Sequence, residues 1–340
     1  MNRTCKHTFR PGCEDLEGRQ LLSSVAAKPI GIPTPIHPLP PPGPLDPIRA
    51  EYAATANETD AYGTVVQRLL GLPTSGEMNV PGVPGARMET FQGGAIYWSP
   101  STGAHVVYGG IGAKYNSLGG PVGYGLPVSD EANVPGVPGV RVTDFQNGGA
   151  LYWSAATGAH AVYGAIGAEY AATANETDAY GTVVQQILGA PTSDEMDVPG
   201  VPGARMNTFQ GGVIYWSPAT GAHVVYGAIG AEYAATANET DAIGRNVQLL
   251  LGLPTSDEVN VPGVPGARMN TFQGGVIYWS PATGAHVVYG AIGGLYNSLG
   301  GPTSFLGLPI SDEQSIPGGR VSYFQNGTIV WSPSGGAHVV

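Results

Sequence analysis

Short runs in which apolar and polar residues alternate recur along the chain and predict β-hairpins. In the first run, Ile96 and Trp98 alternate with Tyr97, residues 99–104 are rich in turn formers, and an apolar run begins again at 105–107. Alternation with a period of two is typical of a half-buried strand, and two such runs around a short turn predict a hairpin. We therefore expect at least two strands per segment, with the indole of Trp98 on one face and the ring of Tyr97 on the other.

This hairpin pattern occurs five times at a nearly constant spacing. Each copy has a tryptophan followed seven residues later by a histidine, and a Phe-Gln pair precedes it. Several copies at a fixed period are the signature of a repeat architecture. The repeats are residues 48–110, 111–165, 166–228, 229–291 and 292–340.

Two segments distinguish the repeats from one another. Repeats one, three and four contain Ala-Ala-Thr-Ala-Asn-Glu-Thr-Asp, which we call the insertion and which repeats two and five lack. After the first insertion we expect a short helix from Ala61 to Leu70 with Asp60 as its N-cap. Repeats one to four also contain Val-Pro-Gly-Val-Pro-Gly, which predicts type II turns because glycine accepts a positive φ.

The fold class follows from the small size of the units and from their shared phase. A unit of this size with so few charges is marginal alone, so neighbouring units should share a core. The last repeat ends at Val340, just before the point at which the other repeats continue into the next one, and Ile48 occupies that point in the first repeat. A closed ring would place Val340 beside Ile48 and leave no open sheet edge. We expect a mainly β repeat protein with short helices, whose five tandem units close into a pseudo-five-fold, propeller-like ring. A linear array is the alternative, and in either case we expect a monomer.

Composition and charge exclude several classes of protein. Charged residues make up 11% of the chain, which excludes a coiled coil, and 42% hydrophobic residues exclude a disordered chain. The net charge is −11 with only 14 basic residues, so a nucleic-acid-binding surface is not expected. No apolar stretch approaches the length of a membrane span, so membrane insertion is not expected either.

The N-terminal region differs from the repeats. Residues 29–47 contain nine prolines and predict an extended, semi-rigid linker. Residues 1–28 are basic and lack the apolar core of an ordinary signal peptide. Their segment 16–23 resembles the Leu-Glu-x-Arg-x-Leu-Leu-Ser signature found near the N-termini of many secreted planctomycete proteins. That resemblance implies an export-type segment, and hence a protein that is secreted or held at the cell surface; whether the segment is cleaved stays open.

The repeats resemble the LGFP repeat family. The motif that gives the family its name corresponds here to residues 70–73, 124–127, 188–191, 251–254 and 306–309. The accompanying Ser-Asp-Glu, Phe-Gln-Gly-Gly and Ile-Tyr-Trp-Ser-Pro-x-Thr-Gly-Ala-His segments also match the family pattern. The family's repeats occur beside mycoloyltransferase, amidase and other hydrolase domains, where they are taken to attach the enzyme to cell-wall polysaccharide. The resemblance implies a non-catalytic module that binds the wall or surface. This chain departs from the pattern in its Val-Pro-Gly segments, its insertions and the lack of a catalytic domain.

Three sets of recurring residues are candidates for ligand contacts. An indole face can stack on the C–H groups of a sugar, although one large aromatic at the same strand position in every repeat is more often core. The tyrosines opposite the tryptophans are replaced in repeat five by Val330, which favours a surface role. The histidines could contact a ligand or hydrogen-bond within a turn. The candidates are Trp98, Trp153, Trp216, Trp279 and Trp331; Tyr97, Tyr152, Tyr215 and Tyr278; and His105, His160, His223, His286 and His338.

No residue pattern indicates catalysis or a resident cofactor. One Glu and one Arg per repeat, such as Glu77 and Arg87, are expected to pair. Serine, histidine and acidic residues are all replicated from repeat to repeat, whereas an active site is normally a single constellation. The histidine spacing matches no metal motif, so we expect no metal and no cofactor.

Two classes of function remain. The first is a secreted, non-catalytic protein that binds or anchors to cell-wall or other extracellular polysaccharide, which the scarcity of basic residues suggests is neutral. The second is a structural or protein-interaction scaffold at the cell surface without sugar binding. The sequence identifies neither the glycan nor the place where it binds.

Overall fold

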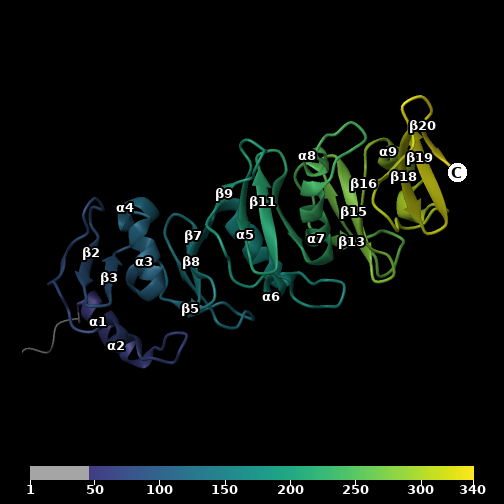
Figure 1. The fold of residues 1–340 in the computed structure, drawn as a ribbon. Helices are drawn as coiled ribbons and strands as arrows, with labels where there is room; N and C mark the ends of the chain where they lie inside the picture. Colours follow the sequence, from purple (N-terminus) through teal and green to yellow (C-terminus); the bar gives the residue numbers. More distant parts are fainter. Residues whose placement is uncertain (1–45) are drawn as a thin grey trace, which may run out of the picture. The chain divides into compact units, whose positions relative to one another are not determined.

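Each repeat folds into one four-stranded antiparallel sheet, and the strands of each sheet are in chain order (Figure 1). The structure is a computed structural model that describes residues 46–340. The export-type segment expected at 1–28, and all but the end of the linker expected at 29–47, lie outside the described residues.

The predicted hairpins are confirmed, and they form the centre of every sheet. In the first sheet, Ile96 lies opposite Val106 and Trp98 opposite Ala104. Two further strands extend the hairpin on the side of its first strand. The first sheet consists of β1 (Met78–Asn79), β2 (Arg87–Thr90), β3 (Gly94–Ser99) and β4 (Gly103–Tyr108).

The other four sheets repeat this arrangement. The second has β5 (Ala132–Asn133), β6 (Val140–Asp144), β7 (Gly149–Ser154) and β8 (Gly158–Tyr163). The third has β9 (Met196–Asp197), β10 (Arg205–Thr208), β11 (Gly212–Ser217) and β12 (Gly221–Tyr226). The fourth has β13 (Val259–Asn260), β14 (Arg268–Phe272), β15 (Gly275–Ser280) and β16 (Gly284–Tyr289). The fifth has β17 (Gln314–Ile316), β18 (Gly319–Phe324), β19 (Gly327–Ser332) and β20 (Gly336–Val339).

The Val-Pro-Gly segments form the predicted turns. The N–H of Val83 donates to the carbonyl of Val80 over 3.2 Å, and Gly82 at the third turn position has a φ of 75°. A positive φ at this position is typical of a type II turn, and it strains residues other than glycine. The prediction is therefore confirmed.

A helix precedes each sheet, although the sequence did not predict these helices. They are rich in glycine and alanine and carry one isoleucine and one tyrosine on the buried face, as Ile111 and Tyr115 do. Glycine disfavours helix, so tertiary packing stabilises them rather than propensity. The helices are α1 (Pro47–Ala54), α3 (Gly109–Ser117), α5 (Gly164–Ala172), α7 (Gly227–Ala235) and α9 (Gly290–Ser298).

The helix expected at 61–70 is shorter than predicted. It is α2 (Val66–Leu70), and Asp60 does not cap it; its Oδ1 instead accepts from the N–H groups of Tyr62 and Thr64 in the turn before it. An aspartate that bonds its own chain two residues on forms an Asx-turn, which competes with helix at that point. The corresponding helices are α6 (Val184–Leu188) and α8 (Val247–Leu251), and the short repeats have α4 (Gly120–Tyr124) and the 3₁₀ turn η4 (Gly301–Thr303). Further 3₁₀ turns are η1 (Thr55–Asn57), η2 (Thr173–Asn175) and η3 (Thr236–Asn238).

Neighbouring repeats share their cores, as the sequence predicts. The helix between two sheets packs on both of them, and Tyr115 of α3 lies at its centre. Its ring stacks on Phe145 of the same repeat at 4.7 Å and meets Tyr97 of the preceding repeat edge-on at 5.7 Å. The same three-ring contact recurs at the next three junctions. Each of the first four sheets therefore packs one face on the helix before it and the other on the helix after it.

The structure shows five tandem units but does not show the expected closed ring or propeller. The main contacts in residues 46–340 connect each unit to its neighbours through the intervening helix. Val340, expected to lie beside Ile48, is 68% exposed, whereas Ile48 is buried against Phe91 and Ile96 of its own repeat. Stacking through helices buries the sheet faces without closure, so the shared phase of the first and last repeats does not require a ring. Among the described helices, none combines the length and apolarity needed to cross a membrane.

Candidate functional site

The recurring tryptophans lie at the surface of the cores, where they line pockets. All five indoles are half-buried and pack against a core cluster. Trp98, Trp153, Trp279 and Trp331 each line a surface pocket. The tryptophans therefore pack against the cores, and four of them also face a surface pocket.

Three of these pockets have the same construction, and we call them the junction pockets. The pocket between repeats one and two has a volume of about 340 Å³ and is bounded by residues 60–62, Leu69, the start of α3 and Trp153. The ring of Tyr62 meets the indole of Trp153 edge-on at 5.8 Å, although Tyr62 itself is 70% exposed. One wall of the pocket is thus formed by the residues that come directly after the insertion of one repeat, and the opposite wall by the tryptophan of the next repeat.

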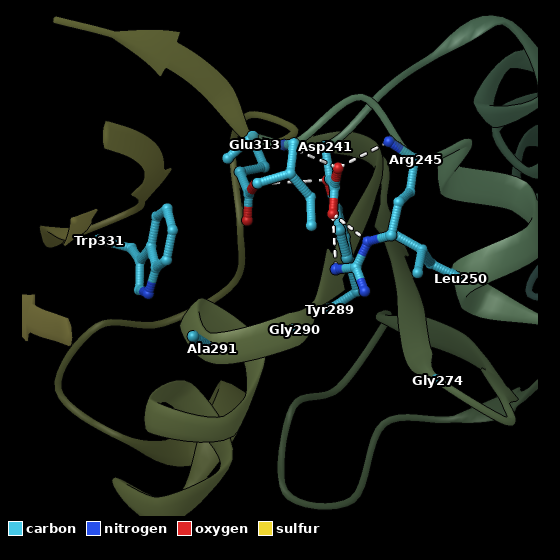
Figure 2. A pocket seen from close by; sticks show the side chains of 11 residues that line it. Asp241, Arg245, Leu250, Gly274, Tyr289, Gly290, Ala291, Glu313 and Trp331 are labelled. Carbon is cyan, nitrogen blue, oxygen red and sulfur yellow. Dashed lines mark hydrogen bonds and ion pairs between the residues drawn. The ribbon is translucent and has the colours of Figure 1, made fainter. Parts of the chain in front are cut away.

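The other two junction pockets follow the remaining insertions. The one between repeats three and four, of about 220 Å³, has Tyr180 edge-on to Trp279 at 6.0 Å. The one between repeats four and five, of about 340 Å³, has Ile243 in place of this tyrosine. Figure 2 shows Trp331 on one side of that pocket and the ion pair of Asp241 and Arg245 on the other, with Nε and Oδ2 2.8 Å apart.

The acidic groups of the first junction pocket are compensated by the chain itself. Asp60 Oδ1 accepts the N–H groups of Tyr62 and Thr64 at 2.9 and 2.8 Å. Glu131 is paired with Arg141 at 2.9 Å, and both side chains are more than nine-tenths buried. Burial raises the pKa of Glu131 and the guanidinium of Arg141 opposes that rise. The pocket therefore offers oxygen acceptors but little uncompensated charge.

Hydrogen-bond donors lie beside the same walls. No side chain of residues 46–340 caps the start of α3, whose residues Gly109 and Gly110 line the pocket. The N–H groups of a first helical turn have no partner within the helix. The hydroxyl of Tyr108, which also lines the pocket, is buried and has no hydrogen-bond partner of normal geometry within residues 46–340. Burial is the main cause that raises the pKa of Tyr108, so its hydroxyl remains protonated.

Acidic residues from adjacent repeats also form clusters that sequence analysis did not find. Glu51, Glu58 and Asp130 each place an oxygen within 4.8 Å of the others and could together hold a cation. The equivalent clusters are Glu169, Glu176 and Asp257, and Glu232, Glu239 and Asp312. Burial and the nearby Asp130 raise the pKa of Glu51 to about 7. Burial and the adjacent aspartates Asp257 and Asp312 raise those of Glu169 and Glu232 to about 8.

The junction between repeats two and three has a different charge pattern. There Lys114 occupies the helix position that is Glu51, Glu169 and Glu232 elsewhere, and it pairs directly with Asp194. Repeat two has no insertion and therefore no counterpart of Glu58. The glutamate pair and the insertion thus occur together, which is the sequence signal that could have revealed the clusters.

The histidines and the ion pairs belong to the frame of the repeat. In the first four repeats the histidine Nε2 lies 2.9–3.0 Å from the carbonyl of the threonine three residues before it; His338 is exposed. The aspartate of the next repeat contacts the histidine Nδ1 and accepts the N–H that follows, as Asp130 does from Val106 at 3.0 Å. The predicted Glu–Arg pairs are confirmed in all five repeats, at 2.8–2.9 Å.

The candidate tyrosines lie between the repeats. Tyr97 and Tyr278 are buried and Tyr152 and Tyr215 half-buried, each against the tyrosine of the following helix. In the first four repeats this position is therefore a packing position between two repeats. Repeat five has Val330 here. The most exposed tyrosines of the described residues are instead Tyr62 and Tyr180, which sequence analysis did not single out.

Comparison with solved structures gives only distant similarities. No curated protein matches the chain. Among solved structures, the TCP10 domain of Danio rerio CPAP is 11% identical, with 75% of this chain and 82% of that chain covered and a TM-score of 0.22. BamB from Moraxella catarrhalis is 9% identical, with 78% and 74% covered and a TM-score of 0.14. Similarities this low carry no argument about fold or function.

The family comparison gives a definite result. The model of the family described as LGFP repeat matches five times, at residues 70–123, 125–178, 188–241, 251–304 and 306–340. These matches cover well over half of the chain and coincide with the five sheets. Repeats of this family are commonly found in cell-surface proteins. The chain therefore belongs to the LGFP repeat family.

Proposed function

We propose that this protein is a non-catalytic, exported protein of the cell surface that binds or anchors to a neutral wall or extracellular polysaccharide. The observation that carries the proposal is the row of half-buried tryptophans, four of which line surface pockets. An aromatic ring that is fixed on one side and accessible on the other suits stacking on a sugar. Membership of a family common in cell-surface proteins supports the proposed location.

The structural roles of the acidic and histidine residues support a non-catalytic function. The side chains that could form a triad, such as His105 and Asp130, are engaged by backbone groups of the frame. The same bonds recur at later junctions. An active site is normally one constellation with a perturbed nucleophile or base, whereas these groups are repeated structural contacts.

The charge of the chain supports a neutral ligand. Lys114 is the only lysine of the repeats and is paired with Asp194. The five recurring arginines are paired with glutamates. An excess of negative charge repels nucleic acid, anionic lipid and acidic glycans. Several equivalent pockets on one monomeric chain would act together through avidity.

The test is a pull-down of the full chain with isolated bacterial wall and surface polysaccharides, separated into neutral, acidic and amino-sugar fractions. We expect retention by at least one neutral fraction, and competition by the soluble form of the same glycan. Retention by no polysaccharide would contradict the proposal and favour a structural or protein-interaction scaffold at the cell surface.

A further inference from the structure

We propose that the insertions, together with the turns at 60–64 and 178–182 that follow them, are the ligand-binding elements of this protein, and that the junction pockets bearing Tyr62 and Tyr180 each bind one neutral sugar unit. This inference rests on the proposed function and assigns its site. It also states which junctions bind and which do not. The tryptophan occurs in every repeat, and each of the three junction pockets follows an insertion.

The local structure of the insertion explains how the pocket forms. The insertion ends at Asp60, whose Asx-turn holds the N–H groups of Tyr62 and Thr64 and so fixes the tip at residues 60–64. The carbonyl of Asp60 also accepts the N–H of Gly63 at 3.1 Å, which closes the same turn. The fixed tip places the ring of Tyr62 against the indole of the next repeat. The Tyr180 tip is held in the same way by Asp178.

The chemistry of the walls favours a neutral sugar. Two rings meeting at 74° form an aromatic corner, to which a pyranose can present its apolar C–H face. The start of α3 and the hydroxyl of Tyr108 provide donors, and the carboxylates of Asp60 and Glu131 provide acceptors. Sugar hydroxyls need both kinds of partner. The volumes of about 220 and 340 Å³ lie near the lower end of the range for small-ligand sites, roughly 300–1,000 Å³.

The charges of the pocket argue against an ionic ligand. Neither of these two pockets is lined by a lysine or an arginine, which disfavours an acidic sugar. The glutamate of each is already held by a buried arginine at 2.9 Å, and the aspartate by two backbone N–H groups. Both carboxylates therefore already have partners within the chain, and a cationic ligand would have to displace them.

The third junction pocket differs in the two residues that would decide binding. Ile243 stands where the others have tyrosine, and Arg245 stands where they have Thr64 and Thr182. The aromatic corner is therefore absent, and the guanidinium paired with Asp241 lies on the wall instead (Figure 2). We expect this pocket to bind the same sugar much more weakly than the other two.

The experiment is a binding titration of the full chain on immobilised dextran, mannan and galactan, with the double variant Tyr62→Ala, Tyr180→Ala. Both tyrosines are more than two-thirds exposed, so the variant should fold normally. The matched control is Phe305→Ala, because Phe305 is an exposed aromatic of repeat five, which has no insertion, and lines none of the junction pockets. Melting curves of all three proteins check that the fold is unchanged.

We expect the double variant to lose affinity on the order of tenfold or more for whichever polysaccharide retains the wild type, because avidity amplifies the loss of two sites. The control should bind like the wild type. Equal binding by wild type and double variant would overturn this inference and leave the proposed function standing. Retention only by chitosan or polygalacturonate, added as cationic and anionic probes, would overturn the neutral occupant. Retention of the wild type by no polysaccharide would overturn both.

Discussion

Two junctions share the same frame but differ in the segments added to it: the one between repeats three and four follows an insertion, and the one between repeats two and three does not. In both, an aspartate of the later repeat accepts an edge-strand N–H of the earlier one: Asp257 from Val224 at 3.0 Å and Asp194 from Ala161 at 2.9 Å. Capping the outer strand in this way protects an edge that could otherwise pair with another chain. The frame therefore forms with or without an insertion.

The additions change the surface and charge of the junction. Between repeats three and four, the insertion brings Tyr180 to Trp279 and Glu176 to Asp257. Between repeats two and three there is no insertion, and Lys114 replaces the first glutamate of the cluster. The frame thus rests on residues that all junctions share, whereas the binding that we propose depends on a segment that only some of them possess. The predictions below separate these two parts, beginning with the largest effect.

The largest effect is expected from the arginine of the frame. Arg268 is nine-tenths buried with Glu258 and also reaches the carbonyl of Thr177 in the preceding insertion. We expect Arg268→Ala to lower the free energy of unfolding by about 3–5 kcal/mol, because it leaves a buried carboxylate unpaired. The measurement is urea unfolding followed by circular dichroism.

The matched control for that change is Arg205→Ala. Arg205 is 30% exposed and lies in repeat three. The preceding repeat two has no insertion, so Arg205 has no counterpart of the Thr177 carbonyl to reach. Its loss should cost about 1 kcal/mol. Equal costs for the two variants would show that the insertion contributes nothing to the stability of the junction.

The second effect is a decline in stability as the pH rises. The pKa of Glu51 is raised to about 7 and those of Glu169 and Glu232 to about 8, so each binds a proton in the folded state that the unfolded state has already lost. Stability should therefore fall from about pH 5 to pH 8. Because these side chains are only partly buried, solvent screens the effect, and we expect only about 1 kcal/mol per cluster.

The pH effect has a direct control in the triple variant Glu51→Gln, Glu169→Gln, Glu232→Gln. It should flatten the dependence of the melting temperature on pH, in the presence of a chelator that removes divalent cations. A triple variant with the same slope as the wild type would assign the slope to other groups.

The third effect exchanges the charges of the two junctions. Lys114→Glu would place a carboxylate beside Asp194 and should cost about 1 kcal/mol, a value that allows for the partial exposure of Asp194. Glu169→Lys would place an ammonium beside Asp257 and should stabilise the chain by a similar amount above pH 8. Differential scanning calorimetry of both variants measures the shift. A destabilising Glu169→Lys would indicate that the lysine reaches its aspartate only in the short repeat.

The smallest effect is expected from salt. Binding through stacking and neutral hydrogen bonds is barely screened. The affinity for a neutral polysaccharide should change by less than about twofold between low and physiological ionic strength. Binding isotherms at the two salt concentrations test this. A steep loss of affinity with salt would require basic contacts, and the neutral-glycan interpretation would be wrong.

The sequence predicted the parts of the fold that depend on local pattern. The alternation around Trp98 gave the hairpin, the glycines of the Val-Pro-Gly segments gave the turns, and the recurring Glu and Arg gave the ion pairs. The helices before each sheet were missed because glycine and alanine carry no amphipathic pattern, and only the contacts of residues such as Tyr115 stabilise them.

The site was predicted only in part, because it forms between repeats. The tryptophans were recognised from their recurrence, but Tyr62 lies 91 residues before the indole that it meets. The expectation of a closed ring was wrong for a related reason. The positions of Ile48 and Val340 within their repeats do not show that the helices between the sheets already cover the sheet faces. Periodicity identifies the frame, whereas contacts between repeats depend on the tertiary fold.

The most direct test is the number of neutral oligosaccharides that one chain binds, measured by calorimetric titration with a short, monovalent fragment of a polysaccharide that retains the protein. Our account predicts two strong sites, one for each tyrosine-bearing junction pocket, and a third when the double variant Ile243→Tyr, Arg245→Thr restores the aromatic corner and removes the guanidinium from the wall. Five equal sites, one for each tryptophan, would contradict it, as would a count that the double variant leaves unchanged.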